Sequence, residues 1–151
     1  GADTVTNPKA FQMLLWTMFE VASEDTIVLC WEKIRLAMDA SYARLQEIEP
    51  FRMIFQHFDA VSLSIKLAIL ESLKNIISSS NLLNSELGAF LSVFQSNRPS
   101  TVMIVCDFLR KILSDKCVAA KVLLPAGIVP NLLRLLVPPE ELHCATVLSL
   151  S

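Results

Sequence analysis

The chain has 151 residues, of which 53% are apolar and 19% are charged, and its formal net charge is −2. Acids and bases are interspersed, which excludes the electrostatic footprint of direct nucleic-acid binding or of an anionic-membrane surface. Three glycines among many aliphatic residues favour helices with short connections over strands with glycine turns. The composition therefore predicts an all-α protein that is long enough to bury a core.

The mean hydropathy of +0.51 could indicate a membrane protein. Charged residues interrupt the apolar runs, however, and none approaches the roughly 18 to 20 apolar residues that span a bilayer. No basic-then-apolar leader opens the sequence. We expect an intracellular protein, nuclear or cytoplasmic, whose excess hydrophobicity reflects helices buried on two sides or the exposed ends of a longer array.

Capping residues divide the apolar sequence into predicted helices. Asn7-Pro8 predicts a helix start, with Asn as the cap and Pro in the first turn, and this helix runs to about residue 22. The pattern predicts further helices at about 25–38, 41–48, 50–58, 59–78, 83–94 and 97–113. Asp59 is the predicted cap of the helix at 59–78.

An acid, two spacer residues and a base recur in three of these helices, at Glu32 to Arg35, Glu71 to Lys74 and Asp107 to Arg110. The acids follow one another at steps of 39 and 36 residues. A period near 40 is typical of solenoids, whose stacked repeats usually bind other chains on a long concave surface.

The C-terminal part carries a resemblance to a known family. A short apolar stretch at 115–124 is followed by the corner Pro125-Ala126-Gly127, by Ile128-Val129-Pro130, and by Leu132-Leu133-Arg134-Leu135-Leu136. This segment closely resembles the first and second helices of an armadillo repeat, and the stretch after Pro138-Pro139 resembles the third.

The resemblance implies an α-solenoid of stacked armadillo-like repeats with HEAT-like variation, about three and a half repeats in one domain over 3–151. The implied repeat units are roughly 8–38, 40–78, 79–114 and 115–151. We interpret Gly1-Ala2 as a cloning scar and expect the parent protein to be longer.

In armadillo proteins the third helices line the groove, where a tryptophan and an asparagine four residues later commonly hold an extended peptide. Acids or serine take the tryptophan position here (Glu32, Glu71, Asp107, Ser149), and the asparagine position holds Leu36, Asn75 and Lys111. Acids alternating with bases favour a charged or amphipathic helical partner over a basic localisation peptide. Alternatively, each acid–base pair is only a local ion pair worth about 0.2 to 0.5 kcal/mol on a solvated face.

Three aromatic residues have contrasting expectations. Phe108 aligns with Lys33 and a serine, so it is either covered by a neighbouring helix or offered to a partner as an anchor. Trp31 aligns with apolar residues and is expected in the core. Trp16, in a helix crowded with Phe11, Met18 and Phe19, is either core or part of an exposed apolar face.

Catalytic and metal chemistry is not indicated. The cysteines lie far apart in apolar helical contexts (Cys30, Cys106, Cys117, Cys144), which favours buried thiols in a reducing compartment. His57 and His143 belong to no metal-ligand spacing, and no phosphate loop or nucleophile elbow is present. We expect no enzyme activity and no cofactor.

The sequence therefore predicts a non-catalytic protein–protein interaction module, a scaffold segment that binds a peptide or amphipathic helix in its groove or on an exposed apolar face. The candidate partner-binding residues are Trp16, Glu32, Arg35, Glu71, Lys74, Asn75, Asp107, Phe108, Arg110 and Lys111. Glu71, Asn75, Asp107 and Lys111 are predicted to be exposed and coplanar. The alternative is a structural spacer that self-associates, forming homo-oligomers through its apolar ends.

Overall fold

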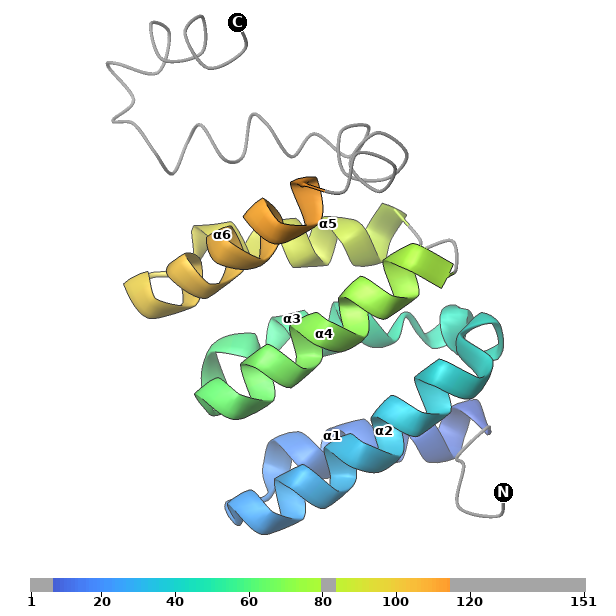
Figure 1. Ribbon diagram of the computed structural model, residues 1–151. Coiled ribbons are helices and arrows are strands. Elements are labelled where there is room, and N and C mark those ends of the chain that lie inside the picture. The colour runs from blue at the N-terminus through green and yellow to red at the C-terminus, as the bar shows by residue number, and fades with distance from the viewer. Residues whose placement is uncertain (1–6, 80–83, 115–151) are drawn as a thin grey trace, which may run out of the picture. The chain divides into compact units, whose positions relative to one another are not determined.

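The computed structural model describes residues 7–79 and 84–114, and these residues form helices and their connections, with no strand among them (Figure 1). The helices are α1 Pro8–Glu20, α2 Glu24–Leu45, α3 Pro50–Gln56, α4 Leu63–Ser79, α5 Asn84–Ser92 and α6 Pro99–Leu113. Short 3-10 turns η1, η2 and η3 occupy Gln46–Ile48, Phe58–Ala60 and Val93–Gln95. The all-α prediction is confirmed for the described residues. The chain divides after Phe90 into two compact units, Gly1–Phe90 and Leu91–Ser151.

The predicted start of the first helix is confirmed. The side-chain oxygen of Asn7 accepts hydrogen bonds from the backbone N–H groups of Lys9 and Ala10, at 2.9 and 3.3 Å. Pro8 stands in the first turn, where its missing N–H costs no helical hydrogen bond. The cap thus satisfies two donors that the helix itself leaves open.

The two helices predicted at 25–38 and 41–48 form one kinked helix, α2. Ser41 interrupts it with a non-helical conformation, φ −153° and ψ 45°. The side chains on either side of the kink, Met38 and Tyr42, are both buried, so the bend keeps both segments in contact with the core.

The predicted cap of the long helix α4 is wrong. Asp59 lies in the 3-10 turn η2, and α4 begins four residues later, at Leu63. The hydroxyl of Ser62 accepts from the backbone N–H of Ile65 at 3.4 Å and caps the helix instead. The extra turn places Phe58 in the core, at 1% exposure, before the chain enters the helix.

In the first unit, α1 packs on α2, α2 contacts α4, and α1 contacts α3. Figure 1 is viewed from the side of α2 and α4, with α1 and α3 behind them. The hydroxyl of Ser62 donates to the carboxylate of Glu24 at 2.7 Å, which joins the starts of α2 and α4. The two helices therefore begin beside each other and run in the same direction (Figure 1).

The core of the first unit is rich in aromatic rings. Phe55 lies at its centre, with ring centroids 5.9 Å from Phe51, 5.4 Å from Phe58 and 5.3 Å from Phe90. Phe11 and aliphatic side chains of α1 and α2 complete it. Rings at these separations add attraction beyond the burial of their area.

The second unit is described by itself. η3 packs against α6. Within α6, Val105, Leu109 and Ile112 are buried at three- and four-residue spacing. The segment that resembles an armadillo repeat, 115–151, lies outside the described residues.

Candidate interaction surface

The three long helices each carry the same surface stripe, which is exposed except at the half-buried Arg35 and Asp107. An exposed apolar residue is followed four residues later by an acid and seven residues later by a base, a spacing that keeps all three on one helix face. The stripes are Val28, Glu32 and Arg35 on α2, Leu67, Glu71 and Lys74 on α4, and Met103, Asp107 and Arg110 on α6. The apolar members are 47%, 52% and 70% exposed.

The buried positions repeat in the same register. Trp31 and Leu70 are 4% and 2% exposed, and both directly precede the acid of their stripe. The prediction that Trp31 belongs to the core is confirmed. Its indole Nε1 is buried and has no hydrogen-bond partner among the described residues. The 39-residue step also separates Ser23 and Ser62, which cap α2 and α4.

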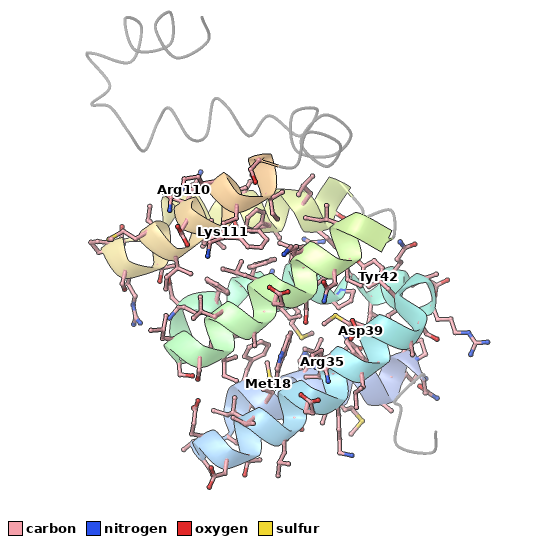
Figure 2. The ribbon with its side chains drawn as sticks, in the orientation of Figure 1. Met18, Arg35, Asp39, Tyr42, Arg110 and Lys111 are labelled. Atoms are coloured by element: carbon pink, nitrogen blue, oxygen red, sulfur yellow. The ribbon has the colours of Figure 1, made fainter. Side chains whose placement is uncertain are left out.

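On α2 a single base serves two acids. The guanidinium of Arg35 donates to Glu32, with Nε–Oε2 3.3 Å, and to Asp39, with Nη1–Oδ2 3.1 Å. The hydrogen bond from Arg35 lowers the pKa of Glu32, and the same bond raises the pKa of the guanidinium. Figure 2 shows Arg35 and Asp39 one turn apart on α2. This pairing is the local ion pair that the sequence offered as an alternative to binding.

On α4 the predicted residues Glu71, Lys74 and Asn75 are all exposed. The ion pairs found among the described residues do not include Glu71. Because α2 and α4 are in contact and start at the same level, Glu32 and Glu71 occupy equivalent levels of neighbouring helices.

On α6 the predicted acid is bound by two bases. Asp107 accepts from Arg110 and lies 3.2 Å from the Nζ of Lys111. The hydrogen bonds from Lys111 and then from Arg110 lower the pKa of Asp107. Both bases are exposed, as Figure 2 shows for this end of α6. Phe108 is buried, at 9% exposure, which corresponds to the first of its two predicted alternatives and not to an exposed anchor.

On α1 the exposed apolar alternative for Trp16 holds. Trp16 and Met13 are 54% and 67% exposed, whereas Phe11 and Met18 are buried. Phe19 is half-buried and stacks on the ring of His57, with centroids 4.4 Å apart.

The first unit also contains a buried polar cluster that was not predicted from the sequence. Glu86, with none of its surface exposed, accepts hydrogen bonds from the hydroxyl of Tyr42 and from the backbone N–H of Phe51. Burial raises the pKa of Tyr42, and the hydrogen bond to Glu86 raises it further. The cluster joins α2, α3 and the first turn of α5 within the first unit. No local sequence pattern pairs Glu86 with Tyr42 or Phe51, so the sequence carries no signal of this cluster.

A second contact adjoins this cluster. Glu49, a non-glycine residue at φ 49°, accepts from the hydroxyl of Ser85 and pairs with Arg52 at 3.2 Å. The Ser85 hydrogen bond, followed by that from Arg52, lowers the pKa of the Glu49 carboxyl. These contacts join the start of α3 to the start of α5.

The described residues contain no group of three or more histidines, cysteines or acids that could hold a metal ion. In the same part of the chain, no helix is both long enough and apolar enough to cross a membrane. Cys30 is buried and Cys106 half-buried, both as free thiols, and burial raises the pKa of each. Cys117, Cys144, His143 and Ser149 lie outside the described residues.

The structure brings some of the predicted residues together. Glu32, Arg35, Glu71, Lys74 and Asn75 lie on the adjacent helices α2 and α4. Asp107 and its neighbours belong to the second unit, so their common plane with Glu71 stays a prediction. The sequence analysis did not single out the exposed apolar residues Val28, Leu67 and Met103, although each stands four residues before a repeated acid.

Comparison with known proteins assigns this chain to no family. No family model matches this sequence, and no solved structure matches it.

Proposed function

We propose that this chain is a non-catalytic interaction module, an intracellular segment of an armadillo-like α-solenoid that binds a peptide or amphipathic helix of a partner protein. The proposed binding surface is the outer face of α2 and α4. The proposal includes no cofactor and no reaction.

The observation that carries the proposal is the repeated stripe. Val28 and Leu67 expose apolar surface at equivalent levels of two adjacent helices, and Glu32 and Glu71 follow them one turn later. A soluble protein gains nothing in folding from exposed apolar side chains, whereas a binding surface uses them as contacts within a polar rim. Stacked repeats present such residues at regular intervals.

A pull-down from cell lysate tests the proposal. The bait is the wild-type chain beside Glu71→Lys, with Glu47→Lys as a matched reversal of one exposed acid outside the stripes. All three proteins must melt at the same temperature. A partner lost only with the first variant supports the proposal, and a partner retained equally by all three contradicts it.

The alternative function, a spacer that self-associates, is supported by a different surface. Met13 and Trp16 expose apolar area one turn apart on α1. Sedimentation equilibrium of the wild type and of Met13→Gln/Trp16→Gln distinguishes the two functions. A dimer that the variant abolishes favours the spacer function. A wild type that stays monomeric at all concentrations contradicts the spacer function.

A further inference from the structure

The exposed face of α2 has a second periodicity, independent of the stripe that recurs on α4 and α6. Exposed acids stand every seven residues, at Asp25, Glu32 and Asp39. Two leucines, Leu29 and Leu36, lie between them and are 66% and 39% exposed. The order is acid, leucine, acid, leucine, acid, at alternating steps of four and three residues.

Alternating steps of four and three define the seam along which one helix packs against another. On most helices of a folded protein such a seam faces the core. Here the core seam of α2 is a separate one, which includes Trp31, Ile34 and Met38. The second seam is exposed and extends over about 21 Å, from Asp25 to Asp39 at 1.5 Å per residue.

The charge on this seam has one sign. The base that pairs with the acids of this seam is Arg35, whose single guanidinium is shared between Glu32 and Asp39. Lys33 is exposed but follows Glu32 directly, so it points about 100° away around the helix. Three carboxylates are thus offset by one guanidinium.

We propose that this acid–leucine seam of α2 is the docking site for a single partner helix that carries bases at every seventh position and apolar side chains between them. The inference rests on the proposed function and names the class of partner. The three- and four-residue spacing selects a helix that lies along α2, because an extended peptide has a two-residue period. The acids select Lys or Arg, whose aliphatic stems cover the leucines while their charges reach the carboxylates.

A second copy of α2 does not fit this site. Two parallel copies place acid against acid, and two antiparallel copies place acid against leucine. Neither arrangement supplies a base beyond each copy's own Arg35, so most of the buried carboxylate charge would have no compensating charge.

Two synthetic peptides of about three heptads, one heptad longer than the seam, provide the test. Both carry leucine at one core position of the heptad, and they differ only in having lysine or glutamate at the other. Binding of each to the whole chain is measured by fluorescence anisotropy at low and high salt. We expect the lysine peptide to bind, with an affinity that falls as salt rises, and the glutamate peptide to bind at least about tenfold more weakly.

Variants of the seam locate the site. Leu29→Gln/Leu36→Gln is expected to weaken the lysine peptide by about tenfold or more. The triple reversal Asp25→Lys/Glu32→Lys/Asp39→Lys is expected to invert the preference, so that the glutamate peptide binds better. Leu63→Gln removes an exposed leucine (58%) from the start of α4, outside the seam and the stripes, and should change neither affinity.

Three results overturn the inference: no binding of the lysine peptide, equal binding of both peptides, or loss of affinity in the Leu63→Gln control to the same extent as in the seam variant. Dimerisation that is abolished by Leu29→Gln/Leu36→Gln would assign the seam to a second copy, which also overturns it. If a lysate partner depends on Glu71 while the peptides fail, the proposed function stands without this partner class. If the peptides bind through the seam and no lysate partner depends on Glu71, the seam stands and the stripe proposal fails.

Discussion

The buried carboxyl group of Glu86 accepts a hydrogen bond from the backbone N–H of Phe51, 35 residues earlier in the chain, at 2.9 Å. Phe51 stands in the first turn of α3, behind Pro50, where the helix provides no acceptor for its N–H. The preceding residue, Glu49, makes no capping hydrogen bond to α3. α3 is therefore capped by a side chain from a distant helix, and the start of α5 is held to α3 by the same bond.

Replacing Glu86 should destabilise the first unit more than any exposed acid does. Glu86→Leu leaves the Phe51 N–H and the Tyr42 hydroxyl without their acceptor, which costs about 1 to 3 kcal/mol for each buried group. We expect a loss of unfolding free energy of several kcal/mol in urea denaturation. Glu20→Leu, at an exposed position, is the control and should change stability by less than about 0.5 kcal/mol. Equal effects of the two substitutions would contradict the cap.

Tyr42 is the one tyrosine of the sequence, so its ionisation can be followed directly by ultraviolet absorbance. Burial raises its pKa, which means that the folded protein keeps the proton at a pH where the unfolded chain loses it. The stability that this proton provides is complete below the ordinary tyrosine pKa of about 10 and is lost as the pH rises above it. We expect no phenolate signal until alkaline unfolding, with both transitions at the same pH. A phenolate that forms while the circular dichroism stays native would contradict the burial.

The Glu49 carboxyl should titrate below an ordinary glutamate because Ser85 and Arg52 stabilise its charged form. The contribution of this group to stability is present above the ordinary glutamate pKa and is lost as the pH falls through the lowered value. Ser85→Ala removes the stronger of these two hydrogen bonds, so the pKa of Glu49 should rise toward its ordinary value in an NMR titration. Arg52→Gln should have a smaller effect in the same direction. An unchanged titration in Ser85→Ala would exclude the Ser85 hydrogen bond as the cause.

Substitutions of the two tryptophans should distinguish the one that stabilises the core from the one that lies on the surface. Trp31→Ala empties a buried site and should cost about 3 to 5 kcal/mol, while Trp16→Ala, at a half-exposed position, should leave stability nearly unchanged. Fluorescence provides an independent check. Trp16→Phe should shift the emission to shorter wavelength, because the buried Trp31 remains, and Trp31→Phe should shift it to longer wavelength. Opposite shifts would contradict the assignment of the two side chains.

The hydroxyl of Ser62 has two roles, as the cap of α4 and as a donor to Glu24, whereas Ser23 caps α2 through a longer contact of 3.5 Å. Ser62→Ala should therefore cost more than Ser23→Ala, about 1 kcal/mol or more against a few tenths. Double replacement of Glu24 and Ser62 by Ala in a mutant cycle isolates the link between the helices. A coupling energy indistinguishable from zero would show that Glu24 and Ser62 do not act together.

Much of the local structure was predictable from the sequence, for a local reason. Asn7 and Pro8 specify a helix start within one turn, since the cap and the groups it satisfies are two or three residues apart. The repeated burial of Trp31 and Leu70 followed from apolar periodicity alone, because a helix face is determined by spacing. The spacing of the acid–leucine seam of α2 can likewise be read along a single helix, whereas its exposure cannot.

Only the tertiary structure decided the rest, because those contacts join residues that are distant in sequence. The wrong cap at Asp59 shows this on a small scale: burial of Phe58 adds a turn that local capping preferences do not include. The acceptor of the Phe51 N–H comes from a helix more than 30 residues away, and no local pattern pairs Glu86 with that group. Whether a repeated acid is exposed also depends on what packs beside its helix. The sequence by itself determined where helices form and which faces are apolar, whereas the packing decided which of those faces remained open to a partner.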